Sequence, residues 1–388
     1  MGRSRIAIAS AAFSLVVDGG PAAAGPDDVA SSSRSPFGTS STELGPVGRS
    51  ALQRCGQPDE ALQSTARWVL ARKRTDGVMP DAEALSRTQR AFGEPHPWAR
   101  AWSAQGGPIG LDATWKVLDE WLAEEGEPRL RRCGVADGLA QDGAPLLVVV
   151  AVDALADMAP LPTRGRTGQW LTVRACLRTV AHGASVIVLG PTGPPRALRG
   201  WFDEDILTAR FALDEPGEFV VQVMAEVAGG PRPVLEARIF ADVEPPQPGD
   251  PPPRREADRH DGESDEHELA RLVSAARAAE GLRPFVVDPL LSIVARRHAQ
   301  RMAQTKRLAH DAGDGSPVDR IRAAGLDVQD FGENVAHAAT VAIAHEAIWS
   351  SPSHRANLVR SQFDRIGIAV VRDDRSEVWA VEELAAGL

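Results

Sequence analysis

The sequence predicts a chain of several domains, with a mixed α+β domain at each end and an all-β sandwich in the middle. A length of 388 residues, 43% of them hydrophobic, is sufficient for two to three packed cores. Residues 166–243 contain five or six short runs in which apolar and polar residues alternate, separated by turns rich in Gly, Pro and Asp. The region after them carries apolar residues at helical spacing, and the region before them repeats parts of that pattern.

Residues 1–24 have the three parts of a secretory signal peptide. Two arginines near the start precede the apolar run Ile6–Val17, and small residues suited to cleavage end at Ala24. An apolar run of 12 residues is too short to anchor a protein in a bilayer, and no later run is long enough. The Ser-rich residues 25–50 are expected to be a disordered leader. We therefore expect an exported protein, outside the cell or in its envelope, with no transmembrane segment.

The first globular segment, residues 51–162, contains sequence similar to the last domain. Similar order over three blocks predicts a duplicated and diverged copy of that domain. This segment lacks a histidine equivalent to His310, and its one histidine, His96, stands in a Pro-rich turn. The alternative that stays open is a divergent helical domain with a pair of strands. The matching blocks are Asp59–Arg72 with Asp288–Arg301, Leu85–Gly93 with Val318–Gly325, and Arg131–Leu155 with Asp364–Leu384.

The three cysteines fit an exported protein. Cys55 and Cys133 lie at opposite ends of the first segment, where a disulfide would add roughly 2–5 kcal/mol to its stability. Cys176 is then left over. The alternative is three free, buried thiols, and the separation of the α-carbons decides between the two.

Residues 164–244 are expected to fold as an antiparallel sandwich that resembles the immunoglobulin-like modules of bacterial surface proteins. No pair of titratable residues stands out there, so we expect this segment to space other domains or to contact a protein. Residues 245–266 are predicted to be a linker, Pro-rich and stiff at first and then charged and flexible. The last domain follows at residues 267–388.

The last domain is predicted to contain two helices, then the loops that carry the candidate site, then two strands. In the second helix, Leu290, Ile293, Val294 and Ala299 are expected to face the core. His298 is expected to be a packing or surface residue rather than a ligand. The expected helices are Glu268–Glu280 and Pro289–Lys306, and the expected strands are Ile366–Val371 and Val378–Leu384.

Two imidazoles and a carboxylate recur about twenty residues apart in this domain, at His310, Glu333 and His354. Each stands next to a small or turn-forming residue, so we expect the polar atoms to point out of a backbone bend rather than into a core. Such a trio has the donor atoms to bind a divalent metal ion.

The position of His354 can be argued from local physics. Ser351 is expected to cap a helix whose first residue is Pro352, because proline has no N–H to leave unpaired there. His354 then lies in the first turn, where the positive end of the helix dipole disfavours imidazolium. The ring is expected to be neutral, with a lone pair available for a metal ion or a proton.

The residues from about Glu268 to Leu384 resemble the CAP superfamily (cysteine-rich secretory proteins, antigen 5 and pathogenesis-related proteins), also called SCP-like extracellular domains, in its short bacterial form. The matching segments appear in the family's order: the helical stretch from Glu268, then RLAH, RIRAAGL, GENVA, SPSHRANLV, FDRIGIAVV and VWAVEEL. The resemblance implies a three-layer α-β-α sandwich. It also implies a central cavity with two histidines and two acidic residues, which in several members bind a divalent cation, often zinc.

Carried over by motif, the resemblance assigns metal ligands to His310, Glu333 and His354. Asn334, beside Glu333, is expected to hold the GEN turn through its amide, and Arg355 to pair with an acidic group at the helix start. The family's second acidic residue has no counterpart at a matching position, and Glu346 is the nearest carboxylate. Three ligands give a weaker and more open site than four.

Three functions remain open at this stage. We favour a secreted binding protein whose cavity takes a metal ion, zinc or another divalent cation, and a small apolar, peptide or glycan ligand. The second is a metal-dependent hydrolase with Glu333 as the base, although no GxSxG, Cys-His pair or HExxH motif is present. The third is a structural or adhesive envelope protein without an active site. A net charge of −10 without clustered Lys and Arg argues against nucleic-acid binding.

Overall fold

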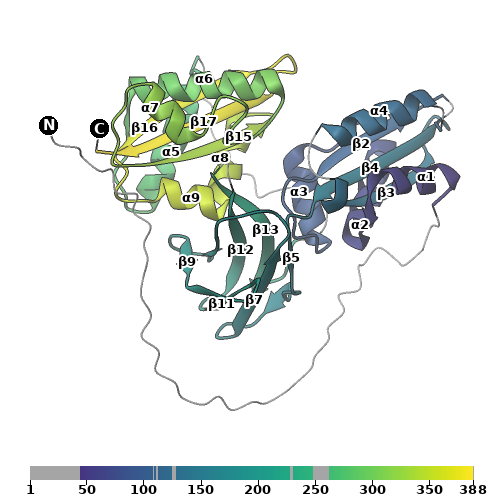
Figure 1. The fold of residues 1–388 in the computed structure, drawn as a ribbon, viewed down its shortest axis with the longest axis horizontal. Coiled ribbons are helices and arrows are strands. Elements are labelled where there is room, and N and C mark those ends of the chain that lie inside the picture. Colours follow the sequence, from purple (N-terminus) through teal and green to yellow (C-terminus); the bar gives the residue numbers. More distant parts are fainter. Residues whose placement is uncertain are drawn as a thin grey trace, which may run out of the picture. The chain divides into compact units, whose positions relative to one another are not determined.

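The computed structural model describes residues 44–107, 109–110, 112–124, 128–227, 230–247 and 262–387 (Figure 1). The predicted signal peptide at residues 1–24 and most of the predicted leader lie outside these residues, as do residues 248–261 of the predicted linker. No helix in the described ranges is long and apolar enough to cross a membrane.

The C-terminal domain is built on a four-stranded sheet with the order β14-β16-β17-β15. β14 and β16 are parallel, whereas β17 is antiparallel to both of its neighbours, β16 and β15. β15 is an edge strand. The elements in chain order are α5 (Asp265–Ala279), β14 (Val286–Val287), α6 (Pro289–Thr305), α7 (Pro317–Ala323), β15 (Asp330–Ala338), α8 (Val341–Ser350), α9 (Pro352–Leu358), β16 (Arg365–Arg372) and β17 (Val378–Ala386).

Helices cover both faces of this sheet. Successive residues of a strand point to opposite sides, so one strand can pack against helices on both faces. On β15, Val335 packs in a cluster with Ala295 and Ala299 of α6, whereas Ala336 packs in a different cluster with Leu269 of α5 and Ile348 of α8. The domain therefore has three layers, helix on sheet on helix (Figure 1).

The helix α6 begins where the sequence predicts it and buries a slightly different stripe. Asp288 caps it by accepting hydrogen bonds from the backbone N–H groups of Leu290 and Leu291. The buried face contains Leu291, Val294, Ala295, His298, Ala299 and Met302. Leu290 and Ile293 are about half exposed, so the prediction that they face the core is wrong. The same prediction is confirmed for Val294 and Ala299, which are buried, and Leu291 takes the core position expected for Leu290.

α5 begins at Asp265, two residues before the predicted domain boundary at 267. The Ser264 side chain accepts a hydrogen bond from the backbone N–H of His267, and three acidic residues occupy the first turn. The acidic end of the predicted linker thus starts the helix.

The first segment forms a second four-stranded sheet with the order β1-β3-β4-β2. β1 is parallel to β3, and the pairs β3 with β4 and β2 with β4 are antiparallel. The order and the directions are those of β14, β16, β17 and β15. The elements are α1 (Pro46–Cys55), β1 (Gln57–Pro58), α2 (Glu60–Asp76), α3 (Ala82–Ala91), β2 (Arg100–Gln105), α4 (Asp112–Ala123), a short 3-10 turn (Pro128–Leu130), β3 (Arg131–Leu139) and β4 (Pro145–Asp153).

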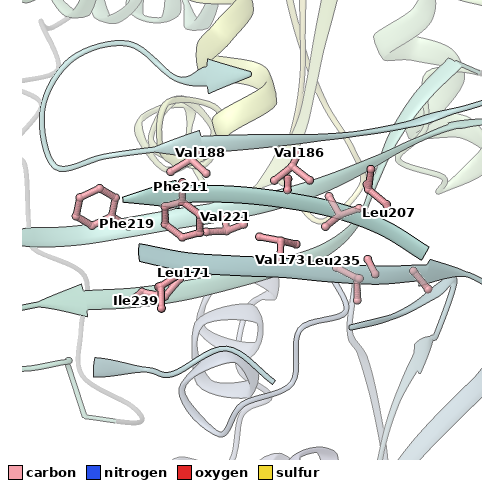
Figure 2. Packing of buried hydrophobic residues seen from close by; sticks show 14 of the residues in the cluster. Leu171, Val173, Val186, Val188, Leu207, Phe211, Phe219, Val221, Leu235 and Ile239 are labelled. Atoms are coloured by element: carbon pink, nitrogen blue, oxygen red, sulfur yellow. The ribbon is translucent and has the colours of Figure 1, made fainter. Parts of the chain in front are cut away.

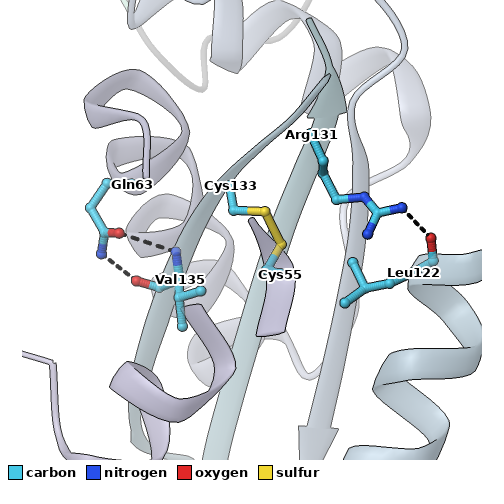
Figure 3. The surroundings of a disulfide bond; sticks show 6 residues. All are labelled: Cys55, Gln63, Leu122, Arg131, Cys133 and Val135. Carbon is cyan, nitrogen blue, oxygen red and sulfur yellow. Dashed lines mark hydrogen bonds between the residues drawn. A yellow bond between two sulfur atoms is a disulfide. The ribbon is translucent and has the colours of Figure 1, made fainter. Parts of the chain in front are cut away.

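The prediction of a disulfide between Cys55 and Cys133 is confirmed, with the two α-carbons 6.1 Å apart. The bond joins the end of α1 to β3 within the apolar cluster on one side of the sheet (Figure 3). On the other side, the Gln63 side chain pairs with the backbone of Val135 and fixes α2 to the same strand. Cys176 is a free cysteine.

The middle of the chain forms two sheets, β10-β11-β7-β5 and β6-β13-β12-β8-β9. Residues from both sheets pack into one apolar cluster, including Phe211 and Val173 from one and Phe219 and Val186 from the other (Figure 2). The predicted sandwich begins earlier than residue 164, because residues 156–158 pair with β7. The strands are β5 (Ala156–Met158), β6 (Arg164–Gly165), β7 (Trp170–Leu177), β8 (Ala184–Leu189), β9 (Arg196–Leu198), β10 (Gly200–Asp203), β11 (Ile206–Ala212), β12 (Gly217–Val227) and β13 (Gly230–Ala241).

Candidate functional site

His310 and Glu333 lie in direct contact in the C-terminal domain. The Nδ1 atom of His310 is 2.7 Å from Oε1 of Glu333. Glu333 does not lie in a turn, as the sequence suggested, but in the nine-residue strand β15, opposite Glu383 of β17. Val335, two residues further along β15, packs on α6. This packing and the pairing of β15 with β17 outweigh the preference of Gly332 for a turn.

Both oxygens of the Glu333 carboxylate are occupied by protein groups. Oε2 accepts a hydrogen bond from the Arg320 guanidinium of α7, while Oε1 faces His310. Burial would raise the pKa of Glu333, but the hydrogen bond from His310 and the electrostatic interactions with His298, His310 and Arg320 lower it to about 2. Glu333 is therefore a fully ionised carboxylate at neutral pH.

Arg320 also fixes the loop that carries His310. Its Nη1 donates hydrogen bonds to the backbone oxygens of His310 at 2.8 Å and of Gly315 at 2.6 Å. A single buried guanidinium thus ties the loop before α7 to the edge strand of the sheet. A capping box between Ser316 and Asp319 holds the start of α7 in place.

His298 of α6 is fully buried next to this pair. Its Nδ1 lies 2.8 Å from Asp314 Oδ2 and its Nε2 lies 3.0 Å from the backbone oxygen of Ala309, with Glu333 Oε2 at 3.9 Å. Both ring nitrogens face oxygen atoms of the loop that carries His310. His298 is thus a packing residue that holds the His310 loop.

His354 lies in the first turn of α9, as predicted. Ser351 is at the N-cap and Pro352 is the first helical residue, but the Ser351 side chain makes no capping hydrogen bond. Burial lowers the pKa of His354 to about 3, and nearby His310 acts in the same direction against the opposing charge of Glu333. The ring is neutral at physiological pH.

Asn334 connects the strand that carries Glu333 to the helix that carries His354. Its Nδ2 donates to the backbone oxygen of His354 at 3.3 Å and to Glu382 Oε2 at 2.9 Å. Its Oδ1 accepts a hydrogen bond from Asn357 Nδ2 at 2.9 Å. Because β15 is the edge strand, groups from both faces of the sheet can meet here.

Arg355 lies away from this network. Its Nη2 is 2.6 Å from Oε1 of Glu280, which follows α5, and its guanidinium stacks over the ring of Trp349, 4.3 Å from the centroid. Its contacts join α9 to α5 and α8.

Three charged residues in this region were missed by sequence reasoning, namely Arg320, Glu382 and Glu383. Burial raises the pKa of Glu382 to about 7, against the hydrogen bond from Asn334. Burial, with the negative charge of Glu333 beside it, also raises the pKa of Glu383. Two consecutive glutamates inside the apolar run VWAVEEL were the available signal, since a strand covered on both faces has no solvated side for them.

The predicted ligand atoms approach one another only in part. His310 and Glu333 are in contact, and His354 interacts electrostatically with both. Among the described residues, the group whose ligand atoms all lie within 4.8 Å of one another is a different one, formed by His337, Asp373 and Glu377. Glu346 is half-buried on α8, and no hydrogen bond or ion pair joins it to His310, Glu333 or His354 in the described ranges.

Comparison with known proteins gives one family match. Residues 270–382 match the model of the CAP family, described as the cysteine-rich secretory protein family. The uncharacterized protein YkwD of Bacillus subtilis (strain 168) is 29% identical over 116 residues, which are 29% of this chain and 44% of that protein. The aligned region therefore spans less than half the length of this curated relative.

Comparison with solved structures finds similarity to two bacterial proteins, among others. An outer surface protein from Borrelia burgdorferi has 20% identity and a TM-score of 0.31, covering 33% of this chain and 97% of that chain. An extracellular protein containing a SCP domain from Bacillus anthracis str. Ames has 15% identity and a TM-score of 0.29, covering 60% of this chain and 88% of that chain.

Proposed function

Because residues 270–382 of this chain form a CAP domain of the cysteine-rich secretory protein family, we propose that the protein is an extracellular binding protein whose ligand site lies at His310, Glu333 and His354. The ligand is a small apolar, peptide or glycan molecule outside the cell or at its envelope. A divalent cation, with zinc as the first candidate, is held by the two imidazoles.

The contact between His310 and Glu333 carries this proposal. With Nδ1–H of His310 donating to the carboxylate, the lone pair of the ring lies on Nε2, and the ring is about one-quarter exposed. A histidine that donates its second N–H to a carboxylate is the usual arrangement of a metal-binding imidazole. His354 supplies a second neutral ring, as its pKa of about 3 keeps the lone pair free at neutral pH.

Glu333 acts mainly through His310 in this proposal. Its two oxygens already accept from His310 and Arg320, so the carboxylate orients the imidazole rather than offering a free oxygen. A bound zinc ion would supply a positive charge and an open position for an anionic or carbonyl group of the ligand.

The same contacts disfavour the hydrolase alternative. A general base works best when its pKa lies near the operating pH, but the pKa of Glu333 is about 2. Its basic oxygens are also occupied by Arg320 and His310. The specific observations therefore favour binding over hydrolysis with Glu333 as the base.

Zinc titration by calorimetry, on the wild type and on a His310→Ala/His354→Ala variant, tests the proposal. We expect the double variant to bind zinc at this site at least tenfold more weakly, and His267→Ala, which removes an exposed imidazole of α5, to have no effect. Zinc binding that is unchanged in the double variant would refute the assignment of the ligands. Hydrolysis of a peptide or ester panel by the wild type, abolished in Glu333→Gln, would instead support the enzyme.

The fold of the first segment leads to a second, independent proposal. We propose that residues 46–153 are a diverged CAP-like fold that has kept the sheet and lost the site. The matching strand order, and the hydrogen bonds from Asp59 N to Cys133 O (2.9 Å) and from Asp288 N to Ile366 O (2.8 Å), support it. The sandwich of residues 156–241 then serves as a spacer or a protein contact of the immunoglobulin-like kind. An experimental structure in which the first and last domains do not superpose would overturn the proposal that residues 46–153 are a diverged CAP-like fold.

A further inference from the structure

A second group of metal-ligand atoms lies at the far end of β15, away from His310. His337 is on the same face of β15 as Glu333 but four residues further along, which is about 13 Å in an extended strand. It meets the hairpin between β16 and β17, which contributes Asp373 and Glu377. One ligand atom from each of these three residues lies within 4.8 Å of the other two.

The His337 ring is held in position by stacking rather than by a hydrogen bond from its Nε2 atom. Its ring stacks on Trp379, the residue opposite it on β17, with ring centroids 4.0 Å apart. Its Nε2 lies 3.2 Å from Glu377 Oε2, yet this buried atom has no hydrogen bond of acceptable geometry among the described residues. A buried ring nitrogen that lies beside a carboxylate without a hydrogen bond is suited to a cation or a proton between the two atoms.

Asp373 is fixed by the turn in which it lies. Its Oδ1 accepts hydrogen bonds from the backbone N–H groups of Arg375 at 2.9 Å and of Glu377 at 3.1 Å. Its Oδ2 accepts from Trp379 Nε1 at 3.3 Å, and the side chain is 4% exposed. The carboxylate therefore keeps its position when its partners change.

An exposed lysine occupies the place of a cation beside this carboxylate. Lys306 Nζ lies 3.0 Å from Asp373 Oδ2 and 2.6 Å from Asp374 Oδ1. The Lys306 side chain is 53% exposed and Asp374 is 78% exposed, so Lys306 can keep its pair with Asp374 and leave Asp373. The two carboxylates of the group carry more negative charge than this one lysine neutralises.

We propose that His337, Asp373 and Glu377 form a second divalent-cation site, which Lys306 fills in the absence of the ion. One imidazole nitrogen and two carboxylate oxygens suit a first-row transition ion such as zinc, with one position left for water. Calcium and magnesium take oxygen ligands and do not fit the imidazole. The site lies in the CAP domain and is separate from the proposed ligand site.

Zinc titration of the full chain in the His310→Ala/His354→Ala background tests this site alone. We expect about one equivalent of zinc to bind, magnesium not to compete, and a further His337→Gln substitution to weaken zinc binding at least tenfold. His267→Ala is the matched control for loss of an exposed imidazole. Far-UV circular dichroism verifies that each variant remains folded.

Lys306→Gln tests the site through an expected gain in zinc affinity rather than through a loss of binding. Removing the competing charge is expected to raise the zinc affinity about tenfold. Lys116→Gln, which removes a lysine that is 77% exposed on α4, is the matched control and is expected to change nothing. No zinc bound in the double-alanine background, unchanged binding in His337→Gln, or unchanged affinity in Lys306→Gln would each overturn the proposal.

Discussion

Gly367 of β16 lies against the backbone of Leu291 in α6, so closely that a Cβ atom on Gly367 would be 2.2 Å from the Leu291 carbonyl carbon. In the first domain, Gly134 of β3 meets Leu62 of α2 in the same way, at 2.0 Å. In both domains the helix that follows the short first strand contacts the sheet at a glycine, because only glycine allows the two backbones to come so near. The two domains therefore pack helix on sheet by the same device.

Gly367→Ala is expected to destabilise the C-terminal domain by about 3 kcal/mol or more, because the added methyl group overlaps backbone rather than a movable side chain. Gly134→Ala is expected to act similarly on the first domain. The control is Gly138→Ala on β3, whose new Cβ would find its nearest neighbour, Leu70 Cδ2, at 3.4 Å. Urea unfolding followed by circular dichroism measures the difference, and equal midpoints for Gly134→Ala and Gly138→Ala would contradict it.

Arg320→Ala is expected to cost about 3–5 kcal/mol, because it leaves the Glu333 carboxylate buried without its guanidinium. It also removes the hydrogen bonds to the backbone oxygens of His310 and Gly315. Arg322→Ala, two residues later on the exposed side of the same helix, is the control and should stay within about 0.5 kcal/mol of the wild type. Chemical unfolding at pH 7 is the measurement, and a loss below about 1 kcal/mol for Arg320→Ala would speak against a buried ion pair.

The raised pKa of Glu382 predicts that the stability of the folded protein depends on pH. Its pKa is about 7 in the folded protein against 4.5 for the unfolded chain, so the folded state retains a proton that the unfolded state has lost between these values. Stability therefore falls as pH rises from 4.5 to 7, by roughly 3 kcal/mol in total.

Glu382→Gln removes this titration and keeps an oxygen to accept from Asn334. We expect the variant to be more stable than the wild type at pH 8 and to approach it near pH 4.5. Thermal unfolding across this range checks the prediction, with Glu120→Gln on the exposed side of α4 as the control. A wild type and variant that respond in parallel to pH would show that Glu382 does not titrate in this window.

The disulfide between Cys55 and Cys133 closes a loop with a sequence separation of 78 residues. Loop-closure entropy gives about 4–5 kcal/mol for a loop of this length, within the range of about 2–5 kcal/mol found when native disulfides are removed. Cys55→Ala/Cys133→Ala is expected to lower the stability of the first domain accordingly. Cys176→Ala removes the free thiol and serves as the control. Equal stability of the double variant and of Cys176→Ala, measured by unfolding in oxidising buffer, would contradict the prediction.

Local sequence was sufficient to find α5, α6, α9, β16, β17 and part of the site, whereas α7, β15 and α8 lie where only loops were predicted. The Asp288-Pro289 start of α6, the Pro352 start of α9 and the pairing of Cys55 with Cys133 follow from caps, proline and cysteine spacing. The motifs RLAH and GEN likewise named His310 and Glu333, which the structure brings to 2.7 Å. Periodicity in α6 was right for Val294 and Ala299 and wrong for Leu290 and Ile293, because a short apolar run fits more than one stripe of a helix.

The order of residues along the chain was enough to identify the CAP domain and to name the chemical groups that it carries. The folded arrangement was needed to see that Arg320 neutralises Glu333, that Glu383 stands opposite Glu333, and that Glu382 faces Asn334 instead. These relationships depend on the register between β15 and β17, and a shift of one residue would exchange the two glutamates between the faces of the sheet. Charge and protonation in this domain therefore follow from burial and from partners distant in the chain, which no local pattern contains.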